Sequence, residues 1–191
     1  MPRNSNPTDE TPPEPKLIEG KYAILAVVVI GLAGAIGGWW YRSQLQRRAI
    51  ALWGLDAAEL MQHAPRVELL KLTPQSDDIE RDEENSVSFG DTRLGITERI
   101  DVSHSPGLVH LRHSLISDQS FVWSAPLDAC QPRWPYALRF TDDQHLATLL
   151  VDFDCRQATL AERNARVSIK PMAKGLEVFV NEQLETSESR R

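Results

Sequence analysis

Residues 22–41 read YAILAVVVIGLAGAIGGWWY, a stretch of 20 residues without charge or proline between Lys21 and Arg42. An α-helix of that length spans about 30 Å, which matches the hydrocarbon core of a bilayer. Tyr22 at one end and the aromatic run 39–41 at the other occupy the positions that membrane interfaces favour. A buried core helix seldom runs this far without a polar side chain, so we interpret the stretch as a transmembrane helix.

A cleaved secretory signal is the alternative interpretation, because Ala33 and Ala35 form an A-x-A pattern. The apolar stretch continues beyond them through Gly37 and Gly38, and the region before it is long, acidic and rich in proline. A secretory signal begins instead with a short basic segment. Retention as a single-pass membrane anchor is therefore favoured.

Small residues line one face of this helix, where Gly34 and Gly38 form a G-x-x-x-G pair and Gly31 lies close to them. This spacing lets two helix backbones approach closely in lipid and predicts a homodimer through the membrane helix. The alternative is that glycine is simply frequent in membrane helices.

The charge balance excludes one class of partner. The chain of 191 residues has a formal net charge of −6, and the part after the anchor carries 18 basic against 23 acidic residues. An acidic domain has no electrostatic attraction for phosphate backbones, so no nucleic acid partner is expected. Two cysteines are too few for a disulfide scaffold or a structural zinc site, and no phosphate-binding or haem-attachment motif indicates a cofactor.

The anchor divides the rest of the chain. Residues 1–21 are polar, acidic and proline-rich, which predicts a disordered tail. Residues 42–64 are expected to form juxtamembrane helices, the second with a capping box that starts at Asp56. Residues 65–185 are expected to form one globular domain, followed by a disordered tail at 186–191.

Within the domain, strands and helices alternate irregularly, and six acids within 76–86 predict a solvated loop. Alternating or continuous apolar residues predict about five strands, at 67–72, 96–102, 137–141, 146–154 and 167–169. Helical spacing predicts one helix opened by Ser105-Pro106 and a final helix at 173–185. The predicted fold class is a single transmembrane helix plus an α+β soluble domain, with a mostly antiparallel sheet and helices packed on one face.

Three basic residues flank the anchor on each side, so the flanking charges do not indicate on which side of the membrane the domain lies. The two cysteines give a second, independent indication. If Phe140 faces Ala147 in a hairpin, Cys130 comes within reach of Cys155 where the chain bends at Pro132. A disulfide would favour an oxidising compartment and an extracytoplasmic domain. Two reduced cysteines are the alternative.

Two groups of polar residues are weak candidates for chemistry. His110 and His113 lie one helical turn apart and His104 just precedes them, so the three could hold a metal ion, although an exposed polar face explains them equally well. Asp152 and Asp154 alternate on a strand and could act as an acid–base pair, or simply mark a strand end.

Aromatic residues among prolines form a third group of candidates, which either caps the core or forms a recognition patch, with the core interpretation favoured. Its members are Trp123, Pro132, Trp134, Pro135 and Tyr136. The sequence contains no recognisable catalytic set. We therefore expect a membrane-anchored, non-enzymatic binding or accessory protein that meets a lipid bilayer and a protein partner. The alternative is a membrane-tethered enzyme with a metal-assisted site near the three histidines.

Overall fold

The computed structural model describes residues 20–44, 47–74 and 85–189. The chain divides into two compact units, Met1–Arg42 and Ser43–Arg191, and each is described by itself. Nearly all of the predicted N-terminal tail and most of the predicted acidic loop lie outside the described residues.

The first unit contains helix α1, Gly20–Gln44, except for its last two residues, and includes the whole of the predicted membrane segment. Its window Ile24–Tyr41 is long and apolar enough to cross a membrane, and none of it is buried within the protein. Among the described residues, this window is unburied, whereas the core helix of a soluble protein is mostly buried. The window is therefore either a membrane span or a signal sequence.

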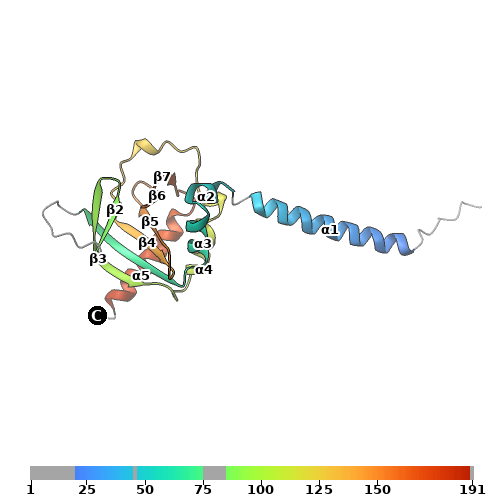
Figure 1. The fold of residues 1–191 in the computed structure, drawn as a ribbon, viewed down its shortest axis with the longest axis horizontal. Helices are drawn as coiled ribbons and strands as arrows, with labels where there is room; N and C mark the ends of the chain where they lie inside the picture. The colour runs from blue at the N-terminus through green and yellow to red at the C-terminus, as the bar shows by residue number, and fades with distance from the viewer. Residues whose placement is uncertain (1–19, 45–46, 75–84, 190–191) are drawn as a thin grey trace, which may run out of the picture. The chain divides into compact units, whose positions relative to one another are not determined.

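The second unit is an α+β domain, as predicted, built on one antiparallel sheet that curls into a half-barrel (Figure 1). The sheet has seven strands in the order β2-β3-β1-β4-β5-β6-β7. Their bounds are β1 Arg66–Pro74, β2 Ser86–Phe89, β3 Thr92–Asp101, β4 Tyr136–Thr141, β5 Leu146–Asp152, β6 Gln157–Leu160 and β7 Arg163–Ser168.

The expectation of about five strands was too low, because β2 and β6 were not predicted. Each has only four residues, which is too short for an alternating pattern to stand out from its surroundings. Each is held by a neighbouring strand, β2 by β3 and β6 by β5 and β7. Strand pairing that depends on residues elsewhere in the chain cannot be recognised from a segment of four residues.

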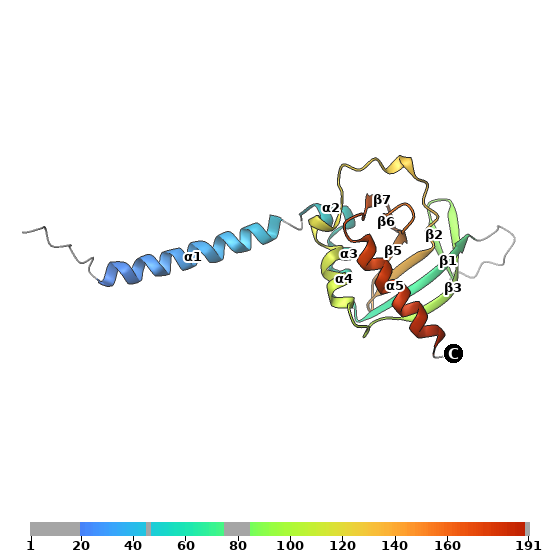
Figure 2. The same cartoon turned by 180° about the vertical axis from the view of Figure 1, so that it is seen from behind.

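The helices of the domain gather on one face of the sheet, and Figure 2 shows α5 crossing the strands on that side. Their bounds are α2 Arg47–Trp53, α3 Leu55–His63, α4 Leu108–Leu115 and α5 Ala173–Glu188, with short 3₁₀ turns at Asp118–Ser120 and Leu127–Ala129. Helix α5 extends beyond its predicted end at Glu185. Thr186 and Ser189 donate hydrogen bonds to carbonyls one turn back, and Ser187 donates one to Glu98 of β3, which keeps this last turn helical.

Two predicted helix starts were wrong in detail. Helix α3 begins at Leu55 after Gly54, whose φ of 87° places it in a region that favours glycine, and no side chain caps it. Helix α4 begins at Leu108 after Gly107, also with positive φ. The hydroxyl of Ser105 does not cap α4, because it donates to Gln183 Oε1 of α5 at 2.7 Å.

The central hairpin has the predicted register, since Phe140 pairs with Ala147. Successive side chains of β5 point to opposite faces. Leu149 and Val151 belong to the main core beneath the helices, whereas Leu150 belongs to a second apolar cluster on the other face. This second cluster, the open-face cluster, contains Leu70, Leu72, Val87, Leu94, Trp134, Ala137 and Leu150.

Candidate binding surface

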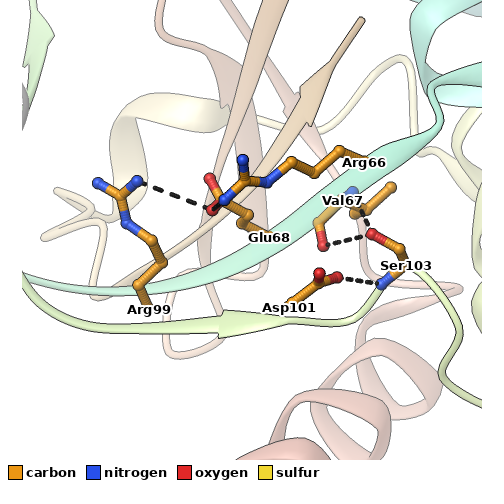
Figure 3. Close-up of polar contacts among 6 residues, drawn as sticks. All are labelled: Arg66, Val67, Glu68, Arg99, Asp101 and Ser103. Atoms are coloured by element: carbon orange, nitrogen blue, oxygen red, sulfur yellow. Dashed lines mark hydrogen bonds and ion pairs between the residues drawn. The ribbon is translucent and has the colours of Figure 1, made fainter.

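A row of charged side chains crosses the face of the sheet that carries no helix, beside the open-face cluster. Residues two apart on a strand share a face, so Arg66, Glu68 and Leu70 of β1 all point to this side. Glu68 pairs in register with Asp101 of β3 and with Arg139 of β4. Three adjacent strands therefore place charged residues side by side, and Figure 3 shows those of β1 and β3.

Glu68 lies at the centre of this row and is only 4% exposed. Its Oε1 accepts a hydrogen bond from Arg66 Nη2 at 2.7 Å and lies 3.7 Å from Arg99 Nη1 (Figure 3). A buried carboxylate is stable only when it is paired and hydrogen-bonded. Arg66 and Arg99 supply that pairing, and breaking it would leave an uncompensated charge in the sheet.

The end of β3 is fixed by a small network next to this row. Ser103 N donates to Asp101 Oδ1 at 2.9 Å, and Val67 N donates to Ser103 Oγ at 2.9 Å (Figure 3). Hydrogen bonds from Ser103, the hydroxyl first and the backbone second, lower the pKa of Asp101 below its ordinary value of 3.8. Asp101 therefore stays ionised and holds the chain in place where it leaves the sheet.

A groove of about 990 Å³ lies between the end of β3 and the C-terminal half of α5. Two hydrogen bonds join its walls, from Ser105 Oγ to Gln183 Oε1 and from Ser187 Oγ to Glu98 Oε1. Its lining is mostly polar and comprises residues 99–101, 104–106, 182, 183 and 185–187. Because Arg99 lines this groove and also faces Glu68, the groove and the charged row form one continuous surface.

The three candidate histidines line three separate hollows. His104 lies in the groove just described, His110 between α4 and α5, and His113 beside Ser117 and Pro171. Within the described residues, no group of three or more His, Cys, Asp or Glu is placed to hold a metal ion. The hypothesis that the three histidines hold a metal ion stays a prediction that metal analysis can test.

Arg112, between His110 and His113 in sequence, has a structural role. Its guanidinium donates to the carbonyl oxygens of Gln62 and Ala64, both at 2.7 Å, at the end of α3. Partial burial in this position lowers the pKa of Arg112 below its usual value. The helical turn that carries the two histidines is thereby used to join α4 to α3.

Cys130 and Cys155 form a disulfide with Cα atoms 5.6 Å apart, the pairing expected from the hairpin register. The bond attaches the loop before β4 to the turn after β5. Disulfides persist in oxidising compartments, so this bond is consistent with an extracytoplasmic domain.

The two carboxylates considered for acid–base chemistry lie in different environments. Asp152 is 2% exposed, and its two oxygens accept hydrogen bonds from Arg133 N and Cys155 N, both at 2.7 Å. Asp154 lies beyond the end of β5 and is exposed. Asp152 therefore holds the disulfide loop in place, and the expected alternation of the two residues along one strand was wrong.

The aromatic residues pack into the domain, in agreement with the favoured core interpretation. Trp134 is 5% exposed and meets the ring of Phe89 edge-on, with ring centroids 5.6 Å apart. Trp123 packs against Phe121 and donates from its indole to the Asp118 carbonyl at 3.0 Å. Of these residues, Trp134 is a buried member of the open-face cluster.

The charged row was not found from the sequence, although one signal was present. Arg99 and Asp101 lie in the strand predicted at 96–102, but nothing local indicated that Glu68 and Arg139 would lie beside them. Comparisons with protein-family models, with curated proteins and with solved structures find no match for this chain. The function must therefore be inferred from the chain's own residues.

Proposed function

We propose that this chain is a membrane-anchored, non-enzymatic binding protein whose disulfide-bonded domain meets a protein partner outside the cytoplasm. The observation that carries the proposal is the continuous surface formed by the charged row and the β3–α5 groove. Concave surfaces with convergent polar groups are the usual location of binding sites. This one lies on a regular sheet and a long helix, which hold its side chains in fixed positions.

Retention of the anchor is part of the proposal. Helix α1 continues without interruption past Ala33 and Ala35 to Gln44, well beyond the point where a signal peptidase would cut. The mass of the protein purified from its own membranes tests this step. An intact mass of about 21.5 kDa supports retention, whereas a product that begins after Ala35 contradicts it.

The binding proposal is tested by co-purification of the full-length tagged protein from its own membranes, with identification of the bound proteins by mass spectrometry. Glu182→Arg combined with Glu185→Arg reverses two charges that line the groove. Glu177→Arg is the matched control, because Glu177 is an exposed residue of the same helix that does not line the groove.

We expect the groove variant to lose a specific protein that both the wild type and the control retain. Removal of well-placed charge contacts typically weakens binding by about tenfold or more. If the wild type and the groove variant retain the same proteins in the same amounts, this surface is not the binding site. A thermal melt of each variant shows whether the domain is still folded.

A further inference from the structure

We propose that Arg139, with Arg99 beside it, binds a carboxylate group of the protein partner, supplied by an acidic side chain or a C-terminus. This inference rests on the proposed binding function and names the chemistry that the surface recognises. It is carried by an arginine in the middle of the sheet whose hydrogen-bonding capacity is unused.

Arg139 lies on β4, the central strand of the seven, between Glu68 of β1 and Thr148 of β5. The residue is half-buried, and its Nε is buried without a hydrogen-bond partner. In the part of the chain that the structure describes, its guanidinium donates no hydrogen bond. Buried donors are nearly always paired in folded proteins, so an unused guanidinium indicates a ligand.

Within the described residues, neither neighbouring carboxylate accepts a hydrogen bond from Arg139, and both have other partners. Glu68 Oε1 is shared by Arg66 and Arg99. Both oxygens of Glu162 accept the backbone N–H of Thr148, at 3.0 and 3.3 Å. Arg139 therefore lies close to two carboxylates without a hydrogen bond to either.

Electrostatics in this region also favour an added negative group. Burial, followed by the charge of Arg99, lowers the pKa of Arg139 below its usual value, and Glu68 and Glu162 only partly oppose this shift. A carboxylate hydrogen-bonded to Arg139 would favour its charged form and so oppose the effect of burial.

The shape of the arginine side chain selects the ligand. A guanidinium group presents parallel N–H donors that match the two oxygens of a carboxylate. Glu68 is held differently, through its single oxygen Oε1, by Arg66 and Arg99. The Arg99 side chain remains one-third exposed.

The test is thermal unfolding of the full-length chain in non-ionic detergent micelles at neutral pH, with sodium acetate, phosphate or chloride at equal ionic strength. For a site with a dissociation constant of about 10 mM, 100 mM acetate should raise the Tm by about 3 °C relative to chloride. Arg139→Gln should abolish this increase in Tm. Arg139→Lys should reduce it, because lysine keeps the positive charge but lacks the parallel N–H donors of the guanidinium group.

Two further variants make the test specific. Glu68→Gln removes the internal competitor for Arg66 and Arg99, so it should enlarge the acetate effect. Arg133→Gln, an exposed arginine outside the row, should leave the effect unchanged. Far-UV circular dichroism and the Tm in chloride show whether each variant is folded.

An equal acetate effect in the wild type and in folded Arg139→Gln would overturn the inference. A larger, Arg139-dependent effect of phosphate would also overturn it, by assigning the site to a phosphoryl group. The two proposals can fail separately. If acetate binding is absent but the groove variant still loses its partner, only the carboxylate site is wrong. If acetate binds but the groove variant retains every protein, the proposed protein-binding surface is wrong.

Discussion

Replacing Cys130 and Cys155 with serine should destabilise the domain strongly without changing its fold. The disulfide joins residues separated by 25 positions. In the chain-entropy model, closing a loop of that length restricts the unfolded chain and stabilises the folded state by about 3.5 kcal/mol. That is a large fraction of the roughly 5–15 kcal/mol of stability that is typical of a domain.

The structure indicates why the fold should survive this loss. Asp152 accepts the backbone N–H groups of Arg133 and Cys155, so hydrogen bonds hold both sides of the loop independently of the sulfur atoms. The main core beneath the helices contains neither cysteine. The double variant should therefore unfold in one cooperative transition, at a lower denaturant concentration.

Urea unfolding of the full-length protein in non-ionic detergent, followed by tryptophan fluorescence, measures the change. With an m-value of about 2 kcal/mol per molar urea, the midpoint should fall by roughly 1.7 M. Wild-type protein in excess dithiothreitol is the matched control and should unfold at the same midpoint as the double variant. A midpoint within 0.3 M of the oxidised wild type, or an oxidised wild type that reacts with maleimide, would refute the reasoning (the tolerance corresponds to about 0.6 kcal/mol).

Three further predictions follow from other parts of the chain. Asp101→Asn should lower the free energy of unfolding by about 0.5 kcal/mol at pH 7, because the variant loses hydrogen bonds that favour the ionised carboxylate. The effect is small because this carboxylate is exposed to solvent. Because the pKa of Asp101 is lowered in the folded state, its ionised form stabilises the fold at pH values above the ordinary pKa of 3.8. In acid denaturation, the difference in free energy of unfolding between the variant and the wild type should therefore vanish as the pH falls through the pKa of Asp101 in the folded state. Gly34→Ile should reduce crosslinking between membrane helices if Gly34 and Gly38 form a helix interface, and unchanged crosslinking would remove that hypothesis. Zinc analysis of the full-length protein should find no stoichiometric metal; bound zinc that is lost in His110→Ala would instead support the metal-assisted enzyme.

Patterns that are local in sequence predicted much of the fold. The apolar helix was evident from its length and ends, and the β4–β5 hairpin from two apolar runs separated by a short turn. In that turn, Asp142 Oδ1 accepts the backbone N–H groups of Gln144 and His145, and these bonds lower its pKa. Such Asx turns depend on residues within three positions, so the sequence displays them directly.

The candidate binding surface could not be predicted in the same way, because it is formed by pairing between distant strands. Glu68 and Arg139 are adjacent only because β1 pairs with β4, and Arg99 joins them only because β1 also pairs with β3. In the sequence each of these residues resembles an ordinary polar position of a half-buried strand. Burial of Glu68 and the unused guanidinium of Arg139 are consequences of those pairings, and both depend on which strands become neighbours. A functional site of this kind becomes visible only when the sheet order is known.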